Sequence, residues 1–242
     1  MTTAARAPLG IRERLVLEGE RLIAAHGLQA VSLRQVAMAA GTANTSAVAY
    51  HFGSKDGLVR AILEYRLPGL IQQRALLRAK IPVPTLRQKV ECHLLPVIDL
   101  AETEGSHYLT FLEQLQQFGP ADHPFARLRP ELRRSNREFV QDLAADLTHL
   151  PPPLRALRVQ QVNTLSLHSA ADRERFRLAG AEHLPFGLYA NNLLDTLTAV
   201  LLAPASSATQ NCLDALPGAN PTEPSVQPVP ISPIPISPVP MP

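Results

Sequence analysis

The chain has 242 residues, of which 45% are hydrophobic, 18% are charged and only 5% are aromatic, and it contains no tryptophan. This length allows one large domain or two small ones and excludes a disulfide-stapled mini-protein. The composition favours a core of Leu, Ala and Val over an all-β architecture. Lys and Arg number 23 against 21 Asp and Glu, and this formal charge of +2 excludes a wholesale polyanion binder but allows a local basic patch.

The cysteine content and the hydropathy pattern indicate the compartment. Cys92 and Cys212 lie far apart in the sequence and form no disulfide framework, which fits a reducing compartment. The N-terminus has no apolar core of signal-peptide length, and no clean run of about 20 apolar residues follows it. We therefore expect a cytoplasmic protein with no membrane partner.

The N-terminal third predicts two helices that end at glycines. Apolar residues from Ile11 to Ile23 share one helical face, and His26-Gly27 closes that helix. Ser32 and Gln35 form a capping box that begins a second helix, which ends at Gly41.

A third and a fourth helix follow closely. Asn44 can cap a helix over residues 45–52, and Ser54-Lys55 begins another helix in which Gly57 replaces the acidic residue that would complete a capping box. Two short helices joined by a glycine turn form a helix-turn-helix, whose second helix enters the major groove of DNA. Through Arg66 the chain carries eight basic and five acidic residues, so the local excess is +3. A modest basic excess suits contact with phosphates.

The prolines divide the rest of the chain into helices and a tail. Pro68, Pro82, Pro84, Pro120, Pro124, Pro130, Pro151 to Pro153 and Pro185 are interpreted as joints, with one long helix over about 154–180 and another over about 185–203. Eleven prolines follow Leu202, which predicts an extended, disordered tail over 204–242. The predicted fold is all-α: a helix-turn-helix domain over 9–66, a helical domain over 67–203, and the tail.

Three pieces of the N-terminal third carry a family resemblance. The segments Val31-Ser-Leu-Arg-Gln-Val-Ala37, Ala40-Gly41 and Tyr50-His-Phe-Gly-Ser-Lys55 resemble, in order and spacing, the DNA-binding domain of the TetR/AcrR family of bacterial repressors. The resemblance covers about 11–66, and beyond it only the helical architecture is similar. It implies a homodimer that binds a palindromic double-stranded operator in the bacterial cytoplasm.

The resemblance also implies residue roles. Ser32 would bond a phosphate, Arg34 would reach a base edge or a phosphate, and Lys55 would clamp a phosphate. Tyr50 and His51 would contact the DNA backbone. The groove end of the recognition helix would be formed by Asn44, Thr45 and Ser46.

The second domain would bind an effector and form the dimer. The two long C-terminal helices would pair with their symmetry mates as a four-helix bundle, although their apolar rows could equally close an intramolecular core. An apolar or amphipathic small molecule would release the protein from DNA. Candidate residues for the pocket are Tyr108, Phe111, Leu112, Leu115 and His168.

Two other functions were weighed against this one. An enzyme is disfavoured because the chain contains no Gly-x-Gly, no Gly-Lys-Ser/Thr loop and no Gly-x-Ser-x-Gly elbow, and we assign no catalytic residue and no cofactor. Cys92-His93 has no second ligand pair at metal spacing, so we expect no metal site. A constitutive DNA-binding protein without an effector would need far less chain after Arg66.

Overall fold

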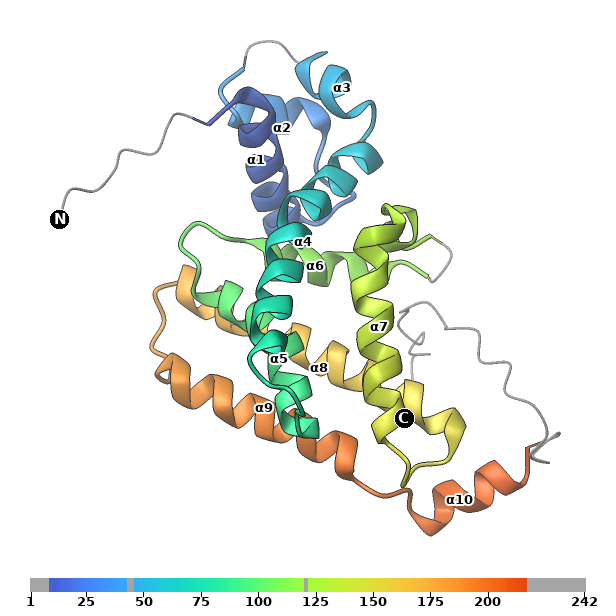
Figure 1. Ribbon diagram of the computed structural model, residues 1–242. Helices are drawn as coiled ribbons and strands as arrows, with labels where there is room; N and C mark the ends of the chain where they lie inside the picture. Colours follow the sequence, from blue (N-terminus) through green and yellow to red (C-terminus); the bar gives the residue numbers. More distant parts are fainter. Residues whose placement is uncertain (1–8, 43–45, 120–121, 217–242) are drawn as a thin grey trace, which may run out of the picture.

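The computed structural model describes residues 9–42, 46–119 and 122–216, and within them it contains helices and no strand. The fold class is all-α, as predicted. Figure 1 shows α2 and α3 at one end of the molecule and α9 and α10 toward the other, with α4 running between the two ends. Asn44, Thr45 and the prolines from 217 onward lie outside the described residues.

The N-terminal domain contains α1 (Ile11–His26), α2 (Leu33–Ala39), α3 (Ser46–Phe52) and the first part of α4 (Lys55–Ala79). Its core is aliphatic, because each helix turns its small apolar face inward: Leu15 and Ile23 from α1, Val36 from α2, Val48 from α3 and Ile62 from α4 are buried in one cluster. These are the faces that the sequence pattern predicts.

The predicted ends of the second helix, α2, are confirmed. Ser32 accepts a hydrogen bond from the Gln35 amide, and the Gln35 side chain accepts one from the Ser32 amide, which completes the capping box. At the other end of α2, the Gly41 amide donates to the Met38 carbonyl and the Thr42 amide donates to the Ala37 carbonyl. This pattern is a Schellman motif, and it uses the positive φ of 71° at Gly41.

The second domain is built from the rest of α4 and from the helices that follow it. These are α5 (Leu86–Ile98), η1 (Asp99–Glu102), α6 (Tyr108–Gln114), η2 (Leu115–Gln117), η3 (Pro124–Arg127), α7 (Pro130–Asp146), α8 (Pro152–Leu178), α9 (Phe186–Leu202) and α10 (Ser207–Asp214). A second apolar cluster joins α5, α7, α8 and α9. The two predicted long C-terminal helices correspond to α8 and α9.

Two predictions about the prolines are wrong. Pro68 is not a joint: α4 continues through it, because Leu67 and Leu70 are buried on either side and hold the helix across the missing amide hydrogen bond. Residues 207–214 of the predicted tail form α10, in which Ser206 accepts a hydrogen bond from the Thr209 amide. Between Pro204 and Pro217 the chain contains no proline, so average composition over 204–242 concealed a helical segment.

Candidate DNA-binding and effector sites

The exposed surface of α2 and α3 carries several of the predicted DNA contacts. Tyr50 is 86% exposed, and its ring meets the half-buried His51 ring edge-on with centroids 5.1 Å apart. Ser32, Arg34 and Ser46 are also exposed. Arg34 forms no ion pair with any acidic side chain among the described residues, so its guanidinium has five free N–H groups.

Lys55 has a structural contact in addition to its predicted role. Its Nζ donates to the Leu28 carbonyl at 2.9 Å and lies 3.4 Å from the Gln29 carbonyl, so it fastens the start of α4 to the loop between α1 and α2. An ammonium has three donors, and one is left for an acceptor from outside. The phosphate contact of Lys55 stays a prediction.

In the turn between α3 and α4, the backbone of Phe52 lies close to Gly57. Ser54 accepts a hydrogen bond from the Gly57 amide, so the N-cap forms without an acidic residue at position 57. A Cβ atom at Gly57 would lie 1.9 Å from the Phe52 carbonyl oxygen. The sequence suggested a weak helix start here, whereas the structure shows a close backbone approach that glycine permits.

A buried ion pair links α1 to α4 beside the start of α6. Glu20 of α1 is 1% exposed, and it accepts two hydrogen bonds from Arg66 of α4, at 2.8 and 2.7 Å. The same carboxylate accepts a third from the backbone amide of His107, the residue before α6, at 3.1 Å. Glu20 therefore connects a helix of the N-terminal domain to the start of α6.

A second buried carboxylate receives the next amides of α6. Glu174 of α8 accepts hydrogen bonds from the Thr110 amide at 2.8 Å and from the Leu109 amide at 3.3 Å. Burial raises the pKa of Glu174, while these amide donors oppose the rise. The first amides of α6 are thus divided between α1 and α8, and any displacement of α6 alters contacts with both domains.

Sequence reasoning missed Glu20 and Glu174, although Glu20 gives a recognisable signal. It lies four residues after Val16 and three before Ile23, both of which are fully buried, so a charged residue falls on the apolar face of α1. A carboxylate at such a position needs a buried partner.

The predicted pocket residues lie in the packed core or on a polar surface. Tyr108, Phe111, Leu112 and Leu115 are buried in the cluster that also contains the core of the N-terminal domain. His168 is partly exposed, and its Nδ1 is 2.6 Å from Glu113 Oε1. Their role in binding an effector stays a prediction.

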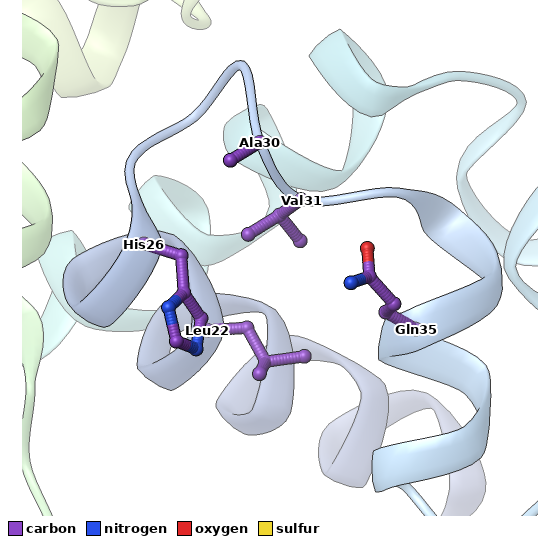
Figure 2. Close-up of a pocket in the computed structure, with 5 residues that line it drawn as sticks. All are labelled: Leu22, His26, Ala30, Val31 and Gln35. Atoms are coloured by element: carbon purple, nitrogen blue, oxygen red, sulfur yellow. The ribbon is translucent and has the colours of Figure 1, made fainter.

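A surface pocket lies elsewhere, on the N-terminal domain. Figure 2 shows Leu22 and His26 of α1, Ala30 and Val31 of the following loop, and Gln35 of α2 around a hollow of about 290 Å³. The Gln35 side chain is already engaged with Ser32 in the capping box. None of the predicted pocket residues lines this hollow.

Two negative findings concern the part of the chain that the structure describes. No group of three His, Cys, Asp or Glu side chains there is arranged to hold a metal ion. No single helix there is long and apolar enough to cross a membrane, although α9 and α10, which meet at 48°, pass the same test as a bent pair.

The helix-turn-helix and its capping pattern are typical of a DNA-binding domain, and a helical domain lies behind it. Residues 15–62 match the model of the tetR family of bacterial regulatory proteins. No curated protein matches the chain by sequence. The match identifies residues 15–62 as a DNA-binding domain of this family.

Solved structures share this fold at low sequence identity. AmtR of Mycobacterium smegmatis superposes with a TM-score of 0.54 at 18% identity, over 89% of this chain and all of its own. A TetR-like regulator from Rhodococcus sp. RHA1 superposes with a TM-score of 0.55 at 15% identity, and the match covers 81% of this chain and 96% of the regulator. A TetR-family regulator from Streptomyces coelicolor superposes with a TM-score of 0.50 at 17% identity, and the match covers 79% of this chain and 94% of the regulator.

Proposed function

We propose that the protein is a homodimeric repressor that binds a palindromic operator through α2 and α3 and is released by a small effector. The carrying observation is the exposed surface of the helix-turn-helix, where Tyr50 projects and Arg34 has no acidic partner among the described residues. Buried apolar residues fix both helices from behind, so this surface is rigid and available for the major groove.

Exposed apolar residues support the dimer. Of the large hydrophobic residues that are exposed in the described chain, seven lie between 157 and 202, on α8, α9 and the loop that joins them: Leu157, Leu165, Phe176, Leu178, Leu184, Leu188 and Leu202. This concentration of exposed apolar residues on two consecutive helices favours association with a second copy. Two copies would then present two reading helices to an inverted repeat.

Operator binding is tested with genomic fragments recovered by the purified protein. Once a bound duplex is known, its affinity is measured by fluorescence anisotropy over a range of salt. We expect Tyr50→Ala to weaken binding to all sequences, and Arg34→Ala to cost about 1–3 kcal/mol at one operator position if Arg34 reads a base. An equal loss of affinity for all operator variants would indicate that Arg34 contacts a phosphate.

The control keeps the same change of charge far from the reading surface. Arg134 on α7 is exposed and pairs with Glu138 in the second domain, so Arg134→Ala is expected to leave the affinity and its salt dependence unchanged. Equal behaviour of Arg34→Ala, Tyr50→Ala and Arg134→Ala would contradict the assignment of the reading surface.

The test of the dimer has a control residue with the same exposed fraction. Leu188 on α9 and Leu76 on α4 are both 57% exposed. Leu188→Asp is expected to yield a monomer in sedimentation and to weaken operator binding, whereas Leu76→Asp leaves the dimer intact. If the protein remains a dimer with Leu188→Asp, with Leu165→Asp and with both substitutions, the interface lies on another surface.

Effector gating is tested by reciprocity. A ligand that lowers operator affinity by some factor must lose the same factor in its own affinity when operator is bound. A tight ligand that leaves operator affinity unchanged would favour the alternative of a constitutive DNA-binding protein.

A further inference from the structure

Two arginines follow one face of α4, and they differ in how their charge is balanced. Arg66, Leu70 and Arg74 are spaced four residues apart, so they lie on the same side of the helix. Arg66 is neutralised by Glu20. Arg74 donates from Nε to the backbone carbonyl of His93 at 2.9 Å, and it forms no ion pair with any acidic residue of the described chain.

The charge of Arg74 is therefore uncompensated in a partly buried position. Burial lowers the pKa of its guanidinium to about 10, and the nearby phenol oxygen of Tyr108 only partly offsets this effect. The carbonyl of His93 engages Nε alone, so both terminal nitrogens of the fork stay available to an acceptor. A buried cation without an anion is an unusual arrangement in a folded protein.

Tyr108 supplies a second unused donor at the same junction. Its side chain is fully buried, and its hydroxyl has no hydrogen-bond partner among the described residues. The guanidinium carbon of Arg66 lies 5.9 Å from the centroid of the Tyr108 ring, which places the phenol beside this face of α4. Buried hydroxyls are normally paired, so an unpaired one marks a place where an acceptor from outside fits.

The other charged and polar groups at the junction have partners of their own or are neutral. The Glu20 carboxylate is engaged by Arg66 and by the His107 amide. Burial and the charge of Arg74 hold the pKa of His93 well below its ordinary value, so its imidazole is neutral near pH 7. The Glu174 carboxylate is engaged by the Leu109 and Thr110 amides, so no acidic group of the described chain pairs with Arg74.

The surroundings of these donors are apolar. The Tyr108 ring stacks near Phe111 with centroids 6.0 Å apart, and the His93 ring stacks on Phe139 of α7. Tyr108 and Phe111 belong to the first apolar cluster and Phe139 to the second, so the donors lie where the two clusters meet. A ligand with one charged end and an apolar body would match both features.

We propose that Arg74 and Tyr108 form the anion-recognising end of the effector site, and that the effector is a small monocarboxylate with an apolar body. The inference rests on the effector-gated function proposed above. Two terminal nitrogens of Arg74 and one phenol suit the two oxygens of a single carboxylate.

The position of the subsite connects it to the DNA-binding surface. Arg74 lies 19 residues after Lys55 on the same continuous helix, a distance of about 28 Å along α4. Tyr108 begins α6, whose first amides are bonded to Glu20 of α1 and Glu174 of α8. A carboxylate that draws Arg74 and Tyr108 together shifts α4 against α6, and both contact α1.

The test compares carboxylates with their neutral primary amides on the full-length chain. The probes are decanoate with decanamide and 2-naphthoate with 2-naphthamide, titrated by calorimetry. We expect each carboxylate to bind at least about tenfold more tightly than its amide, because a charge-assisted hydrogen bond contributes that much or more. Arg74→Gln is expected to abolish the difference.

Two further variants separate recognition from folding. Arg78 lies one turn after Arg74, is exposed and donates to the carbonyl of Ile81, so Arg78→Gln is expected to preserve the preference for carboxylates. Tyr108→Phe removes only an oxygen that has no partner. It is expected to weaken carboxylate binding about three- to tenfold while the thermal midpoint of the free protein stays equal or rises.

Each outcome decides the proposal. Equal affinity for carboxylates and amides overturns it, as does an equal effect of Arg74→Gln and Arg78→Gln; if Arg74→Gln does not fold, unchanged carboxylate binding by Tyr108→Phe overturns it. Failure of the proposed function has a different signature: a carboxylate that binds through Arg74 and leaves operator affinity unchanged supports the subsite and refutes effector gating. Release from operator by the amides as readily as by the carboxylates supports gating and refutes the subsite.

Discussion

Replacing Glu20 by Gln is a direct test of the connection between the domains. The substitution keeps the shape of the side chain and removes the charge that neutralises Arg66. The Glu20 side chain is 1% exposed and that of Arg66 is 17% exposed, so solvent compensates for little of the loss. Breaking a buried pair by removing one partner costs about 3–5 kcal/mol, and the remaining amide oxygen recovers part of this. We expect a loss of about 2–3 kcal/mol in the free energy of unfolding.

Glu18→Gln provides the matched control on the same helix. Glu18 pairs with Arg21 at 2.8 Å, but these side chains are 29% and 44% exposed. Exposed pairs contribute little, so we expect a change below about 0.5 kcal/mol. Both variants are compared with the parent protein by urea denaturation at one protein concentration, followed by far-UV circular dichroism. Equal changes in the two variants would refute the reasoning that burial makes the Glu20 pair strong.

Three other predictions test local features of the fold. Gly57→Ala is expected to lower the thermal midpoint because its Cβ would lie 1.9 Å from the Phe52 carbonyl oxygen, whereas Gly69→Ala on the same helix, with open space around it, is expected to add about 0.5–1 kcal/mol. Burial depresses the pKa of His93, so below about pH 6.5 the unfolded state binds a proton that the folded state does not. The free energy of unfolding is therefore expected to fall as the pH drops, by up to about 1.4 kcal/mol per pH unit, and His93→Gln is expected to reduce this slope. Ending the chain after Ala203 is expected to leave sedimentation and operator affinity nearly unchanged, since no residue of α10 is buried, and a monomeric product would contradict this.

The N-terminal domain could be predicted from sequence because its signals are local. The capping box of Ser32 and Gln35 and the turn at Gly41 depend on residues at most a few positions apart, and the structure confirms both. The reason for a glycine at position 57 could not be predicted in the same way. It depends on where the Phe52 carbonyl lies after the turn, which is a property of folded backbone and not of residue type.

Local signals were misleading where packing overrides them. Proline is a helix breaker on average, yet Pro68 lies within α4 because the helix is held by buried leucines on both sides. Apolar periodicity correctly placed Tyr108 and Phe111 on one face of α6. It did not say whether an effector or α1 and α4 would cover that face, and in the structure the core of the N-terminal domain extends to it.

The residues that sequence reasoning missed share one property, which also suggests how the protein is regulated. Glu20, Arg66 and Arg74 are charged groups on the inward faces of helices, where stability alone would favour apolar side chains. Glu20 and Arg66 pair with each other, whereas Arg74 has no acidic partner in the described chain. The proposed carboxylate would favour an arrangement in which it pairs with Arg74 over the arrangement without it. The differential affinity of the anion for these two arrangements sets the largest change in operator affinity that it can cause.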